Sequence, residues 1–248
     1  MNQQFNVVIV GAGIAGLSMA ALLAQSSAAE SLRITLVDGQ ARPVSPEGQD
    51  IALRVSAIAM GSVELLERIG AWANVPTDRI AAYDAMLVWD ESSSPDSGDA
   101  LHFDAAEFAE PQLGYIVENV MLQAAILEVV QGSSIDLLFD TPIESVEQRD
   151  SGQVLVLSDG RALTADLIIG ADGARSKIRE CAVIDTDKWP YEQSALVTHL
   201  MPEAEHRSVA RQRFLTTGPL GMLPLHDGRI SVVWSTSPEQ VEWPHRRV

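Results

Sequence analysis

The sequence predicts an α/β fold in which a parallel sheet with helices is interleaved with a second, mostly β part. A short apolar, β-branched run at 6–10 ends at a glycine, and an Ala- and Leu-rich stretch follows at 14–25. A second apolar run, 33–37, completes a strand–helix–strand unit of the usual size for parallel strands. Later in the chain, short strand-like runs separated by turn residues predict the β part.

The remaining elements follow the same rules of spacing and punctuation. Apolar residues at helical spacing predict a helix over 57–69, with Gly70 as its C-cap. Residues 119–130 predict another helix, and the Ser-, Pro- and Asp-rich stretch 91–100 predicts an exposed turn between two strands. Asp159-Gly160 is typical of a hairpin turn. Strands are expected at 86–89, 101–103, 135–139, 143–149, 154–157, 162–165, 167–169, 197–200, 209–214 and 230–234.

Composition excludes several classes of function. The chain has 248 residues, 46% of them hydrophobic, which is ample for a sizeable core. Lys and Arg number 17 against 34 Asp and Glu, a net charge of -17, so nucleic acid is not expected as a partner. The one cysteine, Cys181, can form neither an intrachain disulfide nor a thiolate zinc site, and no metal site is predicted. A reducing, cytoplasmic location is the simplest expectation.

The first 29 residues carry no charge, which gives them a superficial likeness to a signal peptide or membrane span. No basic region precedes the apolar stretch, and Gly11, Gly13 and Gly16 interrupt it. No small-residue cleavage site follows a clean apolar run. We therefore expect neither export nor membrane insertion from this segment.

A Gly-x-Gly-x-x-Gly motif lies between the first predicted strand and helix. Gly11 allows a tight turn, Gly13 lets the backbone approach a pyrophosphate, and Gly16 allows close packing of helix and strand. Asp38 ends the next strand, 22 residues after Gly16, where a carboxylate can accept hydrogen bonds from ribose hydroxyls. The predicted cofactor-binding residues of this region are Gly11, Ala12, Gly13, Ile14, Ala15, Gly16, Asp38 and Gly39. The motif alone does not separate NAD from FAD.

A second motif at 166–179 reads Asp-Leu-Ile-Ile-Gly-Ala-Asp-Gly-Ala-Arg-Ser-Lys-Ile-Arg. It resembles the Asp-Gly fingerprint of the flavoprotein hydroxylases of the para-hydroxybenzoate hydroxylase class. The resemblance implies that Asp172 and Gly173 contact FAD and that the segment also serves the reduced nicotinamide. The residues themselves agree, since a carboxylate at a strand's C-terminal end suits the hydroxyls of a ribose or ribityl chain.

A third stretch, Arg-Val-Ser-Ala-Ile at 54–58, places Arg54 among apolar residues just before a predicted helix. A buried Arg needs a fixed anion, either the FAD pyrophosphate or a carboxylate of the protein. Together with Val-Trp-Asp at 88–90 and Gly-Tyr-Ile-Val-Glu-Asn at 114–119, this stretch resembles the ubiquinone-biosynthesis hydroxylases.

That resemblance extends to about residue 239 and implies roles for further residues. Ser56, Asn119 and Ile143 are expected on the cofactor side, Asn119 where the wider class often has an Arg. Gly221, Pro224 and Leu225 are expected on the substrate side of the flavin. The implied fold is a Rossmann-like FAD-binding domain, 1–81 and 112–181, interleaved with a mostly β substrate domain, 82–111 and 182–248.

The implied reaction is hydroxylation of the ring of a polyprenylated phenol, with FAD, NAD(P)H as reductant and O2 as co-substrate. The cofactor carries the chemistry, so no catalytic side chain is predicted. The resemblance also leaves open a peripheral contact with the inner membrane or with a ubiquinone-biosynthesis complex. Since the resembling proteins continue for a further segment that closes over the flavin, we expect an incomplete substrate domain and weak FAD binding.

Two alternatives to the hydroxylase stay open. One is a non-catalytic or assembly protein that retains the fold, and the other is a flavin-dependent reductase of the same fold. His102, His199 and His226 each lie alone in the sequence, without a carboxylate at a recognisable spacing. We interpret them as surface or core-satisfied histidines rather than as acid–base groups.

Overall fold

The computed structural model describes residues 4–45, 48, 50–149 and 152–242. The chain divides into two compact units, which are described separately below. Unit 1 comprises Met1–Glu47, Leu65–Val75 and Val120–Asp187, and unit 2 comprises Gly48–Glu64, Pro76–Asn119 and Lys188–Val248.

Unit 1 is built on a four-stranded parallel sheet of order β12-β1-β2-β8. Its strands are β1 (Phe5–Val10), β2 (Leu32–Val37), β8 (Asp136–Leu138) and β12 (Leu167–Gly170). Helix α1 (Ile14–Ala24) joins β1 to β2, as the sequence predicts. Val7–Val10 of β1 and Leu36 and Val37 of β2 are buried on both faces, which explains why these runs lack the alternation of a half-exposed strand.

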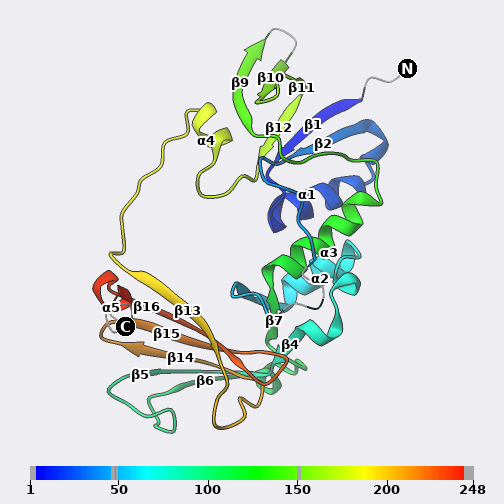
Figure 1. Ribbon diagram of the computed structural model, residues 1–248. Helices are drawn as coiled ribbons and strands as arrows, with labels where there is room; N and C mark the ends of the chain where they lie inside the picture. The colour runs from blue at the N-terminus through cyan, green and yellow to red at the C-terminus, as the bar shows by residue number, and fades with distance from the viewer. Residues whose placement is uncertain (1–3, 46–47, 49, 150–151, 243–248) are drawn as a thin grey trace. The chain divides into compact units, whose positions relative to one another are not determined.

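A three-stranded antiparallel meander lies beside this sheet in unit 1 (Figure 1). Its strands are β9 (Ile143–Arg149), β10 (Gly152–Leu157) and β11 (Ala162–Ala165). Leu155 and Leu157 of the meander form a core cluster with Val8, Val10 and Val37 of the parallel sheet. Gly160, at φ +83°, occupies the predicted hairpin turn.

The longer helices begin close to their predicted positions, with one correction. Helix α3 (Asn119–Gln131) is confirmed, and Lys177–Cys181 forms the short α4. The expected helix over 57–69 is wrong at its start, because Val55–Ala59 is strand β3 and α2 runs over Met60–Arg68. β-Branched and apolar residues pair here with a neighbouring strand, which overrides their helical spacing. Short 3-10 helices cover Ala29–Ser31, Trp72–Asn74, Thr77–Arg79 and Ala105–Phe108.

Unit 2 contains two sheets. The smaller is antiparallel, of order β3-β7-β4, with β4 (Ile80–Tyr83) and β7 (Gly114–Glu118). The larger has the order β13-β16-β15-β14-β5-β6 and is antiparallel except between β14 and β5. Its strands are β5 (Ala85–Asp90), β6 (Leu101–Asp104), β13 (Ser194–Leu200), β14 (Val209–Leu215), β15 (Gly218–Pro224) and β16 (Ile230–Thr236). Helix α5 (Pro238–Glu242) follows.

The compact units and the predicted domains divide the chain differently. Residues 48–64, 76–81 and 112–119 lie in unit 2, whereas the predicted FAD-binding domain includes them. The reason is strand pairing, since β3 and β4 both pair with β7. The functional assignment of these segments to a cofactor domain stays a prediction.

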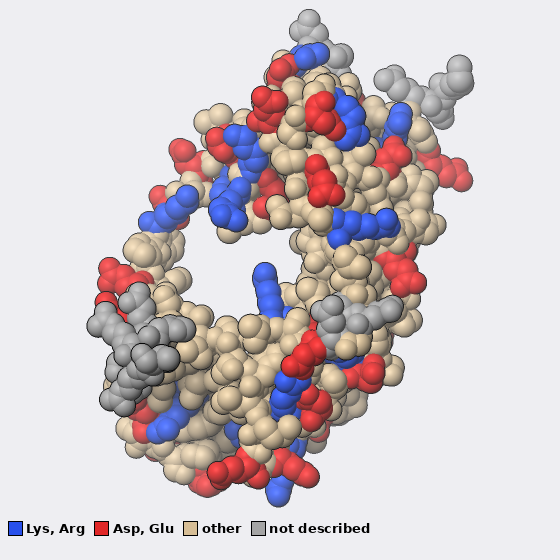
Figure 2. Space-filling view, viewed as in Figure 1, with Lys and Arg blue, Asp and Glu red and all other residues tan. Residues whose placement is uncertain are grey.

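Among the described residues, no helix is both long and apolar enough to cross a membrane. Figure 2 shows acidic side chains mixed with basic ones over the face that is drawn.

Candidate functional site

The glycine turn after β1 is held by hydrogen bonds from two neighbouring strands. The N–H of Gly11 donates to the carbonyl of Val37 over 2.8 Å, and the N–H of Ala171 donates to that of Val10 over 2.7 Å. Gly11 has φ +107°, a conformation that side chains rarely adopt, so the tight turn requires glycine there. The turn is therefore fixed by the sheet before any ligand is considered.

Gly13 and Gly16 need to be glycine for different reasons. A Cβ on Gly16 would collide with the carbonyl of Gly11, so Gly16 permits the close packing of α1 against the turn. A Cβ on Gly13 would meet no protein atom within 4 Å, and its backbone lies at φ -69°. The fold places no steric demand on Gly13, and the space beside it faces the positive end of the α1 dipole.

The peptide of Ala12 is clamped from two sides. Its N–H donates to Oδ2 of Asp38 over 2.5 Å, and its carbonyl accepts from Nε2 of Gln123 over 2.7 Å. Oδ1 of Asp38 accepts from the N–H of Gln40 over 2.7 Å. A carboxylate oxygen has more than one lone pair, so Asp38 retains the capacity to accept further hydrogen bonds. Sequence reasoning did not find Gln123, which lies on α3 far from the turn in sequence.

The predicted Asp172-Gly173 turn lies between β12 and α4. Oδ2 of Asp172 accepts hydrogen bonds from the backbone N–H groups of Lys177 and Ile178, at 2.6 and 3.1 Å. Its Oδ1 accepts from the hydroxyl of Ser176 over 2.5 Å. Asp172 thus satisfies the free N–H groups at the start of α4, and Gly173, at φ +80°, allows the chain to turn.

These motifs meet at one cavity of about 590 Å³ in unit 1. Seven predicted residues line it, from four separate segments of the chain: Gly11, Gly13, Asp38, Gly39, Ile143, Asp172 and Gly173. The remaining four residues of the glycine motif do not line it; Ala12 and Gly16 are buried, Ile14 is half-buried and Ala15 is exposed. The cavity opens at the carboxyl ends of β1, β2 and β12, where open α/β sheets bind ligands.

Sequence reasoning missed two cations at this cavity, Arg175 and Lys177. Both lie within five residues of Asp172, so their position in the motif could have indicated them. Lys177 pairs with Glu180 over 3.2 Å at an exposed position. With Asp38 and Asp172 also present, the lining combines hydroxyl-binding carboxylates with groups that attract phosphate.

Arg54, Ser56 and Asn119 lie in unit 2, where they form a connected group. The expectation of a buried Arg54 is wrong, because the residue is exposed just before β3, and its side chain forms no ion pair among the described residues. The N–H of Asn119 donates to the carbonyl of Arg54 over 3.1 Å. The hydroxyl of Ser56 donates to Oδ1 of Asn119 over 2.9 Å. The backbone of Arg54 is held while its side chain stays available.

A buried ion pair holds the segment that leads to Arg54. Arg79 donates to both carboxylate oxygens of Glu118, over 2.8 and 2.9 Å, and Glu118 also accepts from the N–H of Ala52 over 2.6 Å. The side chains are only 13% and 2% exposed, respectively. The hydrogen bond with Glu118 raises the pKa of Arg79. The pair fixes the chain two residues before Arg54.

A second ion-pair network holds the same segment closer to its start. Arg229 pairs with Asp50 and also with Asp227, the latter over 2.6 Å. The hydrogen bond from Arg229, reinforced by one from the N–H of Ile51, lowers the pKa of Asp50 to about 2. Sequence reasoning found neither this network nor the Arg79–Glu118 pair, since both join residues far apart in sequence.

The three residues expected on the substrate side differ in their surroundings. Leu225 is buried in a core cluster with Ile51, Ala81 and Ile116, and Pro224 is also buried. Gly221 lies directly opposite Val233, which lines a cavity of about 290 Å³ in unit 2. Only Gly221 is therefore adjacent to a cavity; packing within unit 2 accounts for Pro224 and Leu225.

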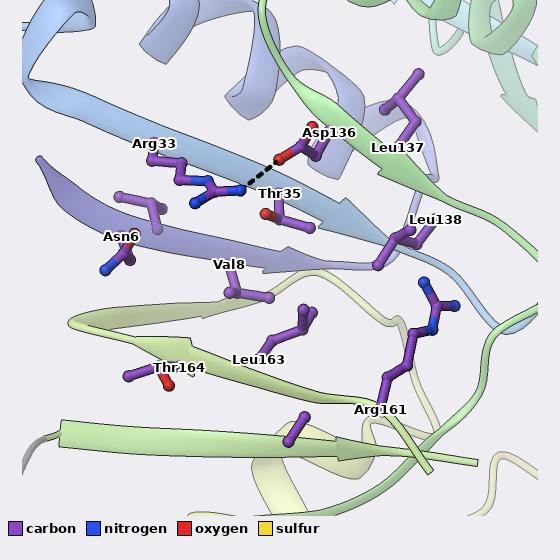
Figure 3. A pocket seen from close by; sticks show the side chains of 12 residues that line it. Asn6, Val8, Arg33, Thr35, Asp136, Leu137, Leu138, Arg161, Leu163 and Thr164 are labelled. Atoms are coloured by element: carbon purple, nitrogen blue, oxygen red, sulfur yellow. Dashed lines mark ion pairs between the residues drawn. The ribbon is translucent and has the colours of Figure 1, made fainter. Parts of the chain in front are cut away.

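Another cavity in unit 1, of about 510 Å³, lies between the parallel sheet and the meander (Figure 3). Arg33 of β2 pairs with Asp136 of the adjacent strand β8 over 3.6 Å, and Arg161 pairs with Asp159 over 2.6 Å. Its charges are thus already matched, and none of the sequence motifs reaches it. We do not assign it a ligand.

Cys181, the single cysteine, is half-buried and free. Among the described residues, no group of three or more His, Cys, Asp or Glu side chains is arranged to hold a metal ion.

Comparison with known proteins identifies a family that matches nearly the whole chain. The family described as "FAD binding domain" matches residues 4–247. A similar protein is the mitochondrial ubiquinone biosynthesis monooxygenase COQ6 of Danio rerio, 35% identical over 97% of this chain and 51% of its own length. Another is the 3-demethoxyubiquinol 3-hydroxylase of Escherichia coli, 33% identical over 97% of this chain and 59% of its own length.

Among solved structures, PqsL of Pseudomonas aeruginosa is similar, with a TM-score of 0.76 and 23% identity. The match covers 97% of this chain and 63% of that one. At this level of identity the likeness concerns the fold. The chain spans between about half and three fifths of the length of the two curated relatives described above.

Proposed function

This chain belongs to the FAD binding domain family, and from that premise we propose that it is the FAD-holding part of an aromatic hydroxylase of ubiquinone biosynthesis. The observation that carries the proposal is the 33–35% identity, over 97% of the chain, to two enzymes named for that pathway. Because the chain spans only part of their length, the hydroxylase activity is proposed for the protein to which this chain belongs.

We assign the pyrophosphate of FAD to the space beside Gly13, at the N-terminus of α1. The fit rests on open space at this position, since a Cβ on Gly13 would meet no protein atom within 4 Å. Free N–H groups and the helix dipole favour an anion at this position. Asp38, held at the end of β2, has lone pairs available for ribose hydroxyls.

The other residues that line the same cavity are assigned to the rest of the cofactor. Asp172 and Gly173 come from the second motif, and Ile143 and Gly39 contribute apolar or open surface. Arg175 and Lys177 add positive charge next to a ligand that carries two phosphates. Asp172 is held rigidly by its three hydrogen bonds to the start of α4, which preorganises it for a ligand hydroxyl.

Arg54, Ser56 and Asn119 are proposed as further cofactor contacts from unit 2. Support comes from the exposed guanidinium of Arg54 and from the hydrogen bonds that fix its backbone. An exposed Arg with no carboxylate partner among the described residues is available for a phosphate or for the flavin.

When bound, FAD supplies the redox chemistry, taking reducing equivalents from NAD(P)H and activating O2 for transfer to a phenol ring. The residues of this chain would bind and orient the cofactor. No protein nucleophile is assigned. The substrate is proposed to be a phenol that carries a polyprenyl chain, since both curated relatives are named for ubiquinone metabolism.

We also propose a cytoplasmic location with a peripheral contact to the membrane, where a polyprenylated substrate would reside. The net charge of -17 indicates that such a contact would be hydrophobic rather than electrostatic.

The direct test is an FAD titration of the purified 248-residue chain, followed by flavin fluorescence and the visible spectrum. Saturable binding of one FAD per chain supports the proposal. NAD(P)H oxidation with a prenylated phenol, and mass spectrometry of the product, then separate hydroxylation from simple reduction. If no FAD binds at any attainable concentration, the cofactor assignment to these residues is wrong.

A further inference from the structure

A small apolar cavity in unit 2 contains an unexplained buried hydroxyl. The cavity of about 290 Å³ is lined by Leu53, Arg54, Val55, Val197, Ser231 and Val233. Ser231 is 0% exposed, and its Oγ has no hydrogen-bond partner among the described residues. Leaving a buried hydroxyl unpaired is costly, so such a group in a cavity wall indicates a missing partner.

A second unpaired polar atom lies next to it. His199 of β13 is directly opposite Ser231 of β16, and Val197 is directly opposite Val233. Directly opposite residues of antiparallel strands share a face of the sheet, as do residues two positions apart. His199 does not itself line the cavity but lies on the same face of the sheet as its wall, and its Nε2 is buried without a hydrogen-bond partner in the described part of the chain. The interpretation of His199 as a core-satisfied histidine does not hold for this atom.

We propose that Ser231 and His199 form the specificity-determining contact for the ring hydroxyl of the phenol substrate. This inference rests on the proposed function and adds to it the residues that recognise the substrate. A phenol hydroxyl both donates and accepts, so one such group can satisfy Ser231 Oγ and His199 Nε2 together. The apolar side chains of Leu53, Val55, Val197 and Val233 suit an aromatic ring.

Stability and binding should respond in opposite directions at Ser231. If the hydroxyl served the fold, its removal would lower the melting temperature. Because the fold leaves this hydroxyl unpaired, Ser231→Ala should melt at the same temperature as the wild type or a few degrees higher. The Ser231→Ala substitution should weaken only ligand binding.

The test uses 2-prenylphenol and its methyl ether as probes, with dissociation constants from isothermal titration calorimetry on the 248-residue chain. We expect the wild type to prefer the phenol, and Ser231→Ala to bind the phenol about fivefold to tenfold more weakly. Binding of the methyl ether should change less than about twofold. Ser235→Ala, on the same strand and outside the cavity lining, is the matched control and should behave as the wild type.

His199→Leu tests the other half of the pair and replaces Ser231→Ala should that variant fail to fold. No preference for the phenol in the wild type, or an equal loss for both probes in the variants, would overturn the inference. Titrating FAD into the same proteins separates the two proposals. FAD binding without a phenol preference overturns only this inference, whereas a phenol preference without FAD binding overturns only the proposed cofactor role.

Discussion

The carboxylate of Asp38 and the backbone N–H of Ala12 are joined by a hydrogen bond of 2.5 Å. The bond connects the end of β2 to the glycine turn after β1. Asp38 therefore fixes the shape of this turn and also lines the proposed cofactor cavity of unit 1. Its second oxygen accepts from the N–H of Gln40. Asp38 thus has a structural role that the motif alone does not indicate.

Asp38→Ala should therefore affect both folding and cofactor binding. Losing two hydrogen bonds to an ionised group should lower the free energy of unfolding by about 2 kcal/mol. Affinity for FAD should fall at least about tenfold, since the ribose contact is lost as well. Urea unfolding and FAD titration measure the two effects. The control is Asp136→Ala, at an exposed position on β8; normal FAD affinity in Asp38→Ala would contradict the assignment.

Gly13 and Gly16 allow a sharper test of the cofactor assignment, because their surroundings differ. Gly13→Ala should change the free energy of unfolding by less than about 1 kcal/mol, since its Cβ meets no protein atom, yet should weaken FAD binding more than about tenfold. Gly16→Ala should unfold at a clearly lower temperature, because its Cβ collides with Gly11. Thermal unfolding and FAD titration distinguish these outcomes.

Gly61→Ala is the matched control for Gly13→Ala. Gly61 also has open space around it, but it lies in α2, where alanine favours the helix, and it does not line the cavity. It should bind FAD normally and be slightly more stable. If Gly13→Ala also binds FAD normally, the pyrophosphate does not lie beside Gly13.

The glycine turn and Asp38 could be predicted from the sequence because their geometry is local. Turn, helix start and strand end are set by residues close together along the chain. Gln123, which accompanies Asp38 in fixing Ala12, could not be predicted, since only the folded chain brings α3 to the turn. The exposed position of Arg54 was missed because its burial was inferred from the apolar residues next to it in sequence, and such neighbours do not guarantee burial.

Strand β15 was missed because its sequence argues against a strand. Gly-Pro-Leu-Gly opens it, and glycine and proline are both unfavourable within sheets. Pairing with β14 on one side and β16 on the other supplies the hydrogen bonds that override this propensity. Packing in unit 2 likewise explains why Leu225 is buried, which no local pattern indicates.

The buried Arg79–Glu118 pair predicts a large effect on stability. Glu118→Gln removes the negative charge that accepts both hydrogen bonds from Arg79, so the free energy of unfolding should fall by about 3 kcal/mol. The exposed Arg33–Asp136 pair, at 66% and 58%, gives the matched comparison. Asp136→Asn should change the free energy by less than about 1 kcal/mol. Urea unfolding measures both, and equal effects would show that burial does not strengthen the Glu118 pair.

The Asp50–Arg229 pair predicts a change in acid stability. Arg229 holds the pKa of Asp50 at about 2 in the folded chain, against an ordinary value of 3.8. A depressed carboxyl pKa stabilises the fold above the unfolded value, and this contribution is lost as the pH falls through the folded value. The stability that Asp50 contributes should therefore be lost progressively as the pH falls from about 5 toward 1, with most of the loss between about pH 4 and pH 2.

Asp50→Asn removes the titrating group and should make the melting temperature less dependent on pH in that interval. Above pH 4 the variant should melt at a lower temperature than the wild type, and the two curves should converge toward pH 2. Thermal unfolding at half-unit steps from pH 2 to pH 6 measures this difference. Asp136→Asn serves as the control, since its exposed pair should leave the curve close to that of the wild type. Parallel curves for Asp50→Asn and wild type would mean that Arg229 does not stabilise the ionised form of Asp50.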